Sequence, residues 1–306
     1  MKVVALAGGV GGAKLADGLA QLLPADDLTV VVNTGDDFEH FGLHIAPDLY
    51  TLAGLANPET GWGRAAESWQ AISGVERLGG PAWFRLGDQD LGTHLERTRL
   101  LRSGVPLSEI TRRFCAAWGV GPSVLPMSDQ PVRTIVKSDQ GELAFQQYFV
   151  QLRCEPRVSG FEFRGAAEAS PAPGVLEALQ AANAVVICPS NPWVSIAPIL
   201  AVPGVREAVE RRPTVAISPI IGGAAVKGPA AKMYAEMGIQ PSAVAVAAHY
   251  QGLAGGFVMD SLDSQLRPEV GRYMKWVFAT QTLMRTPQDR RRLAKDVLHF
   301  IGANCR

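Results

Sequence analysis

The chain contains few cysteines, and their positions exclude the sites that cysteine usually builds. There are four in 306 residues, at positions 115, 154, 188 and 305, and no two of them form a C-x-x-C pair. Zinc sites and redox dithiols need such close spacing, and secreted disulfide scaffolds need a higher density of cysteine. We therefore expect free thiols, a cytoplasmic location and no zinc site.

The chain also lacks net charge and long apolar runs. It carries 29 basic and 29 acidic side chains, so it has no excess of positive charge for a duplex nucleic acid. No apolar run approaches the length of about 18 residues that a membrane span needs. The first run, residues 2–7, breaks at Gly8 and is typical of a buried strand rather than of a signal peptide. We expect neither a nucleic acid nor a membrane as a partner.

Common catalytic signatures are absent as well. No serine lies in a G-x-S-x-G sequence, which argues against an acyl-serine mechanism. His40 and His44 are four residues apart, but Gly42 between them weakens a helical metal pair. Carboxylates, lysines and glycine-rich loops remain as candidates.

Strand-like apolar runs alternate with helical patterns along most of the chain. Strands are predicted at 2–7, 28–32, 184–188, 214–218 and 243–247, and helices at 175–182, 205–211 and 230–237. From Lys14 onward the leucines at 15, 19, 22 and 23 fall on one helical face, so a glycine loop and then a helix follow the first strand. This order is a βαβ unit. The sequence predicts a doubly wound, mainly parallel, Rossmann-like α/β sheet.

Two segments interrupt this alternation. Residues 51–125 lack strand signals and contain helical patterns at 91–102 and 108–118. Further on, strand-like runs at 132–137 and 142–149 flank Asp139-Gln140-Gly141, which is typical of a β-hairpin. We expect a core of residues 1–50 and 126–306, a mainly helical lobe of residues 51–125, and an inserted hairpin.

A glycine-rich stretch, GGVGGAKL, follows the first predicted strand. It differs from the P-loop, where glycine, lysine and serine or threonine are adjacent, and the third glycine of a dinucleotide fingerprint would fall at Lys14. Glycines let a phosphate approach the backbone, and the N–H groups of the next helix can bind it. Gly9, Gly11, Gly12 and Lys14 are therefore candidate phosphate ligands. The alternative is a tight turn beside an exposed lysine.

Two adjacent carboxylates, Asp36 and Asp37, follow the second predicted strand. Like charges at this distance repel unless a cation or hydrogen-bond donors compensate. Mg²⁺ held by one or two carboxylates and by diphosphate oxygens is one solution. A polar turn in which an aspartate caps the next helix is the alternative. Pro47 and Asp48 suit the first turn of that helix.

Three further polar stretches lie beside predicted elements. Two carboxylates, Asp88 and Asp90, bracket Gln89 just before a helix, where an aspartate caps the helix or the carboxylates form a polar ligand site. The loop after residue 188 offers Ser190 and Asn191, whose uncharged hydrogen-bonding groups suit a nucleotide or sugar hydroxyl. The stretch SPIIGGAAVKGP repeats the strand-to-glycine pattern and adds Lys227, either as a second anion ligand or as an exposed turn residue.

Several motifs taken together resemble one family. They are GGVGGAKL, VVNTGDD, PDLYTL, GWG, WFRLGDQDLGTH, VLPMSDQPVRT, FQQYFV, PSNPWVSIAPILAVPGVR and SPIIGGAAVKGPAAKM. In this order they resemble the CofD family over nearly the whole chain, from Val3 to about Leu298. That family consists of phospholactate transferases of deazaflavin coenzyme biosynthesis. The resemblance implies a guanosine diphospho-activated three-carbon acid as donor, the ribityl hydroxyl of the deazaflavin FO as acceptor, GMP as the released product, and magnesium. For bacterial members it implies phosphoenolpyruvate-type or phosphoglycerate-type donors as alternatives.

The resemblance also implies roles for individual residues. The donor would contact Gly9, Gly11, Gly12, Lys14, Ser190, Asn191 and Lys227. Magnesium would bind at Asp36, Asp37 and Asp48, and Asp36 or Asp37 would act catalytically, for example by taking the acceptor's proton. Acceptor contacts would come from Asp48, Tyr50, Asp88 and Gln89. Trp62, Trp83 and Phe84 of the helical lobe would cover the flat deazaflavin, and a cytoplasmic homodimer would be usual for the family.

Three positions depart from the family pattern. Tyr50 replaces an aspartate, Gln89 replaces an arginine, and Gln281 replaces an aspartate near the C-terminus. The first two changes each remove a charge from the expected acceptor side. Our hypothesis is that donor binding is retained and acceptor recognition is changed. A related enzyme with another acceptor and a non-catalytic nucleotide-binding regulator are the alternatives. A nicotinamide dehydrogenase is disfavoured because an aspartate pair, not a single acid, follows the second strand.

Overall fold

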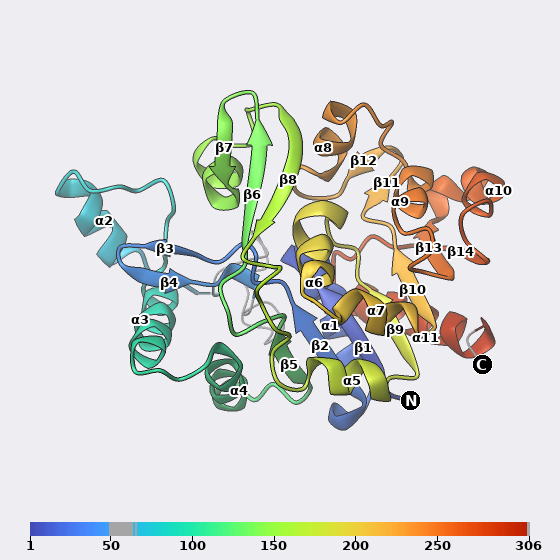
Figure 1. Ribbon diagram of the computed structural model, residues 1–306, viewed down its shortest axis with the longest axis horizontal. Helices are drawn as coiled ribbons and strands as arrows, with labels where there is room; N and C mark the ends of the chain where they lie inside the picture. The colour runs from blue at the N-terminus through green and yellow to red at the C-terminus, as the bar shows by residue number, and fades with distance from the viewer. Residues whose placement is uncertain (49–63, 65, 305–306) are drawn as a thin grey trace.

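A seven-stranded parallel sheet forms the centre of the protein (Figure 1). The computed structural model describes residues 1–48, 64 and 66–304. The strands lie in the order β14-β13-β10-β9-β1-β2-β5, and all neighbours run parallel. Their bounds are β1 (Val3–Ala7), β2 (Leu28–Val32), β5 (Ser123–Pro126), β9 (Ala184–Ile187), β10 (Thr214–Ile217), β13 (Gly256–Asp260) and β14 (Trp276–Thr280). The predicted doubly wound α/β fold is confirmed.

The strand order reverses at β1. From β1 the chain proceeds through β2 to β5 on one side, and it later fills the other side through β9, β10, β13 and β14. Leu6 of β1 lies opposite Ile187 of β9, so the loops that follow these two strands begin side by side. In open α/β sheets the ligand crevice lies outside the carboxyl ends of the strands at such a reversal. The fold therefore points to the residues that follow β1 and β9.

Helices cover both faces of the sheet because its strands are apolar on both faces. Val3 and Ala5 pack with Leu15 and Leu293 in one core, and Val4 belongs to the core on the opposite face. The first core is covered by α1 (Gly9–Ala20) and α11 (Pro287–Asn304), and the second by α5 (Val175–Ala181), α6 (Ala197–Ala201) and α7 (Val205–Glu210).

Additional elements extend from the sheet on two sides (Figure 1). One group consists of the hairpin β3 (Phe38–His40) and β4 (Leu43–Ile45) with α2 (Gln70–Arg77), α3 (Asp88–Arg102) and α4 (Leu107–Ala117). The other is an antiparallel sheet in the order β7-β6-β8, formed by β6 (Arg133–Ser138), β7 (Gly141–Ala144) and β8 (Val158–Arg164). The helices α2 to α4 lie within residues 51–125, and β5 begins shortly before the end of that interval.

Short elements complete the chain. They are the 3-10 helices η1 (Ala25–Asp27) and η5 (Ser261–Leu266), the π-helices η3 (Gln147–Gln151) and η4 (Pro192–Ile196), the hairpin β11 (Ile220–Ile221) and β12 (Ala224–Ala225), and the helices α8 (Ala230–Glu236), α9 (Ala243–His249) and α10 (Arg267–Val270). In the part of the chain described above, no helix combines the length and the apolar character needed to cross a bilayer.

Two predicted elements are wrong. Residues 243–247 form helix α9 and not a strand, because the Ser242 hydroxyl accepts the Ala245 N–H (3.1 Å) and caps the helix. Its buried positions, Ala243, Val246 and Ala247, follow helical spacing. The second strand of the predicted hairpin ends at Ala144, and a π-helix replaces the strand expected up to residue 149.

The sequence prediction also missed some features. β13 and β14 were not predicted, and α1 begins at Gly9 rather than near residue 14. The expected glycine loop is therefore the first turn of a helix.

Candidate functional site

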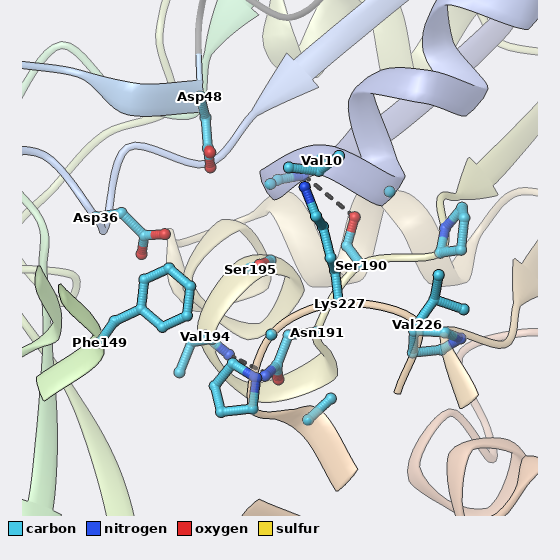
Figure 2. A pocket seen from close by; sticks show the side chains of 18 of the residues that line it. Val10, Asp36, Asp48, Phe149, Ser190, Asn191, Val194, Ser195, Val226 and Lys227 are labelled. Carbon is cyan, nitrogen blue, oxygen red and sulfur yellow. Dashed lines mark hydrogen bonds between the residues drawn. The ribbon is translucent and has the colours of Figure 1, made fainter. Parts of the chain in front are cut away.

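A cavity of about 610 Å³ lies at the carboxyl edge of the sheet, where the strand order reverses. Its wall includes the first turn of α1, residues 189–191, 194 and 195 after β9, and residues 282–284 after β14. Residues 145–150 and the segment between β10 and α8 close it from the sides. Figure 2 shows that side chains from these separate segments point into one space.

The N-terminal turn of α1 forms part of the cavity lining. A Cβ atom added at Gly11 would lie 2.2 Å from the Pro189 carbonyl oxygen, and one added at Gly12 would lie 2.5 Å from the Ser190 hydroxyl. These glycines therefore let the helix end pack directly against the loop after β9. The first N–H groups of a helix have no partner within the helix and carry partial positive charge, so this end suits an anion.

Two lysines bring positive charge to the same side. Lys14 and Lys227 both line the cavity, and Figure 2 shows Lys227 extending along the cavity wall. The Lys14 ammonium donates a hydrogen bond to the Met284 carbonyl (2.9 Å) and retains further donors. Burial lowers the pKa of Lys14, and the charges of Arg290 and Lys227 lower it further. These positive charges repel one another, and an anionic ligand in the cavity would reduce this repulsion.

Two carboxylates, Asp36 and Asp48, also line the cavity, with Asp48 beside the first residues of α1 (Figure 2). Asp36 is only 7% exposed. One oxygen of each carboxylate is buried without a hydrogen-bond partner in residues 1–48, 64 and 66–304. Burial is the main cause that raises the pKa of Asp48 to about 7, and the charge of Asp37 adds to it. Burial and the charge of Asp48 raise the pKa of Asp36 well above its usual range.

This pair fits a divalent cation. Mg²⁺ is commonly held by one or two carboxylates together with phosphate oxygens, and a cation between Asp36 and Asp48 would satisfy the two unpartnered oxygens. Asp37 is engaged elsewhere, because its Oδ2 lies 3.0 Å from Nε2 of His44. Among the described residues no three His, Cys, Asp or Glu side chains are grouped as metal ligands. The structure therefore does not assemble the predicted set of Asp36, Asp37 and Asp48, but it leaves the pair available.

Asn33 holds the carboxylate turn in place, a role that the sequence prediction missed. It is fully buried at the end of β2, where its Oδ1 accepts the Gly35 N–H (2.8 Å) and its Nδ2 donates to the Val194 carbonyl (3.2 Å). Its side chain also hydrogen-bonds to Asp36 and Asp48. A buried amide directly after an apolar strand was the signal available in the sequence.

The loop after β9 contributes two of the predicted donor residues. Ser190 and Asn191 line the cavity. The Ser190 hydroxyl accepts the Gly8 N–H at 3.3 Å. The side-chain oxygen Oδ1 of Asn191 accepts the N–H groups of Trp193 (3.0 Å) and Val194 (3.4 Å), so this side chain caps the π-helix η4. Asn191 therefore shapes the loop, and its predicted contact with a donor remains a prediction.

The predicted acceptor residues are distributed differently. Tyr50 and Trp62 lie outside the described residues. Asp88 accepts the N–H groups of Gln70 and Ala71 (both 3.1 Å) at the start of α2, and the Gln89 amide donates to the Ala66 carbonyl (3.1 Å). Neither Asp88 nor Gln89 lines the cavity. Asp48 does line the cavity. The acceptor role of Asp48, Tyr50, Asp88 and Gln89 stays a prediction.

An apolar aromatic wall stands beside Asp36, and the sequence prediction found only part of it. Phe84 lines the cavity as expected, whereas Trp83 does not. Phe145 and Phe149 line it too, with ring centroids 5.4 Å apart and planes tilted by only 11°. Phe149 is 38% exposed, which is unusual for an aromatic ring beside a cavity. Its place depends on the π-helix η3, a kind of helix often found at functional sites.

Comparisons with known proteins point to one family. The family model described as "2-phospho-L-lactate transferase CofD" matches residues 3–285. A phosphoenolpyruvate transferase of Streptomyces griseus is 47% identical over 282 residues, covering 88% of this chain and 89% of the relative. A 2-phospho-L-lactate transferase of Methanosarcina acetivorans is 38% identical over 307 residues, covering 99% and 100%.

Solved structures show a likeness of fold. A UPF0052 family member from Bacillus halodurans has a TM-score of 0.64 at 14% identity, covering 97% of this chain and 99% of that chain. This likeness concerns the fold alone, and the family is shown by the match over residues 3–285 and by the relatives named above. The chain belongs to the CofD family of phospho-acid transferases.

Proposed function

We propose that this protein transfers the phospho-acid group of a GDP-activated three-carbon acid to the ribityl hydroxyl of the deazaflavin FO and releases GMP. One observation carries the proposal. A single cavity at the reversal of strand order is lined by a helix N-terminus, two lysines and two carboxylates, each of which has one buried oxygen without a hydrogen-bond partner among the described residues. A diphosphate with a divalent cation matches this combination of positive and negative groups.

The donor diphosphate would lie against the first turn of α1. There the free N–H groups and the ammonium groups of Lys14 and Lys227 would bind its oxygens. Asp36 and Asp48 would hold Mg²⁺, which would offset the charge of the diphosphate oxygens. Such transfer needs positioning and charge stabilisation more than covalent work by the protein.

The reaction needs a base for the acceptor hydroxyl. The hydroxyl oxygen would form a bond to the phosphorus that carries the acid, and the bond from this phosphorus to the bridging oxygen of the GMP group would break. The hydroxyl proton would pass to a carboxylate oxygen of Asp36, which lines the cavity. The leaving GMP would stay bound at the helix N-terminus until release.

The names of the relatives support a proposal for the acid that the donor carries. Relatives named phosphoenolpyruvate transferase reach 47% identity, and those named 2-phospho-L-lactate transferase reach 38%. We therefore propose a phosphoenolpyruvate-type donor. The wall formed by Phe84, Phe145 and Phe149 suits a flat, partly apolar acceptor such as a deazaflavin.

A second candidate function is transfer of the same group to a different acceptor. The observation in its favour is the replacement of charged family residues by Tyr50 and Gln89, with Gln89 hydrogen-bonded away from the cavity.

Binding and turnover measurements separate these proposals. Calorimetry should detect Mg²⁺-dependent binding of GDP, and mass spectrometry should detect a phospho-acid adduct of FO together with GMP. No binding of GDP would contradict the proposal as a whole. GDP binding without transfer to FO, followed by transfer in the Tyr50→Asp, Gln89→Arg variant, would favour a changed acceptor.

A further inference from the structure

One wall of the cavity is a separate segment that we call the flap, residues 218–229 between β10 and α8. It contributes Ser218, Ile221, Val226 and Lys227 to the lining. Val226 is 53% exposed although it is large and apolar, so it presents a side chain that a bound ligand would cover. Apart from the two-residue strands β11 and β12, which pair with each other, the flap has no regular structure of its own.

The flap turns back on itself at two glycines. Gly222 and Gly223 have φ angles of 57° and 78°, the left-handed values that a two-residue hairpin turn requires. A third glycine with positive φ, Gly228 at 74°, separates Lys227 from α8. Because glycine has much backbone freedom, the direction in which Lys227 extends depends on what fixes the turn.

Asp263 fixes the turn from outside the cavity. The Gly222 N–H lies 3.2 Å and 3.0 Å from the two carboxylate oxygens of Asp263. Asp263 is on η5, is 3% exposed, and does not line the cavity. A hydrogen bond to an ionised carboxylate in a buried place is stronger than one between neutral groups. At its start the flap is held by Ser218, whose hydroxyl donates to the Ile220 carbonyl (2.9 Å) and accepts the Ile220 N–H (3.2 Å).

We propose that Asp263 is a positioning residue for the donor: it holds the Gly222 turn so that Lys227 and Val226 face the donor's diphosphate end. This inference rests on the proposed function, because it needs an anionic donor in the cavity. Asp263 itself touches no ligand and acts through the flap. Without this anchor the flap would occupy several arrangements, and only the fraction with Lys227 in place would bind the donor tightly.

A double-mutant cycle tests the proposal, with Mg²⁺-GDP as the probe and calorimetry as the measurement. Lys227→Ala should weaken GDP binding about tenfold, the loss expected for one charge-assisted contact. Asp263→Ala should weaken it several-fold through the same lysine, so Asp263→Ala combined with Lys227→Ala should be no worse than Lys227→Ala alone. Asp263→Asn keeps an oxygen that can accept the Gly222 N–H and should bind GDP within about twofold of the unmodified protein.

The matched control is Glu269→Ala, which removes an exposed carboxylate from the neighbouring α10 and should leave GDP binding unchanged. If the two losses of GDP affinity multiply in the double variant, Asp263 acts independently of Lys227 and the proposal is overturned. Hydrogen–deuterium exchange of the ligand-free variants is the second readout. Faster exchange of residues 218–229 in Asp263→Ala supports the anchor, and unchanged exchange overturns it. Failure of the unmodified protein to bind GDP would instead contradict the proposed function.

Discussion

Replacing Asp48 by asparagine should stabilise the metal-free protein while it weakens ligand binding. The charge of the Asp48 carboxylate acts on Asp36, and one of its oxygens is buried without a partner among the described residues. An asparagine of nearly equal size removes the charge, and its side-chain oxygen can still accept the Gly9 N–H that now reaches Asp48. Stability that has been sacrificed for a binding site is typically recovered by such a change.

The magnitude follows from the pKa of this carboxyl. A pKa of about 7 in place of the ordinary 3.8 corresponds to a cost of about 4 kcal/mol to the folded state at pH 8. Because the folded pKa is raised, stability is present at low pH and is lost as the pH rises from about 4 to about 7. We therefore expect Asp48→Asn to raise the free energy of unfolding by about 2–4 kcal/mol at pH 8. The gain should shrink steadily toward pH 4.

Urea unfolding in EDTA at pH 4, 5, 6, 7 and 8 measures this difference. Asp88→Asn is the control, because hydrogen bonds lower the pKa of the partly exposed Asp88. Removal of this carboxylate should stabilise the protein at no pH. Saturating Mg²⁺ and GDP should stabilise the unmodified protein by about 3 kcal/mol at a hundred times the Kd, and the Asp48→Asn variant by much less. A variant that is no more stable at pH 8, or whose gain is the same at every pH, would refute the reasoning.

Two further predictions concern other walls of the cavity. Gly11→Ala should lower the free energy of unfolding by about 1–3 kcal/mol, because its Cβ would lie 2.2 Å from the Pro189 carbonyl oxygen. Gly92→Ala on α3 is the control. Its new Cβ would meet no other part of the described chain, so this change should stabilise the protein slightly. Equal shifts of the melting temperature in the two variants would contradict this account. Phe149→Ala should raise the KM for FO about tenfold through lost stacking and leave the Kd for GDP unchanged. A change in GDP binding alone would show that the aromatic wall serves the donor.

The sequence was sufficient where one local pattern decides the structure. Continuous apolar runs bounded by glycine or polar turns identified β1, β2, β9 and β10, because buried parallel strands are apolar on both faces. The prediction for residues 243–247 failed because all five are alanine or valine, so apolar and polar positions cannot be told apart there, and the Ser242 cap decides for a helix.

The residues of the candidate site also differ in how far the sequence could predict them. Polar residues directly after strands, such as Asp36 and Ser190, could be assigned to the cavity edge from the sequence. Phe149 could not, because the sequence predicted a hairpin strand up to residue 149 and gave no sign of the π-helix that carries this ring. The separation of Asp37 from Asp36 could not be predicted either, because it depends on His44 in a hairpin that the sequence did not indicate.

Transfer to FO by the unmodified protein tests the central claim most directly. The purified protein is mixed with Mg²⁺, FO and a GDP-activated phosphoenolpyruvate-type or phospholactate-type donor, and both products are followed by mass spectrometry. We predict one GMP released for each phospho-acid joined to FO, faster with the phosphoenolpyruvate-type donor, and no product from the Asp36→Asn variant. Unchanged turnover in Asp36→Asn, or binding of GDP with no transfer from either donor, would contradict the account.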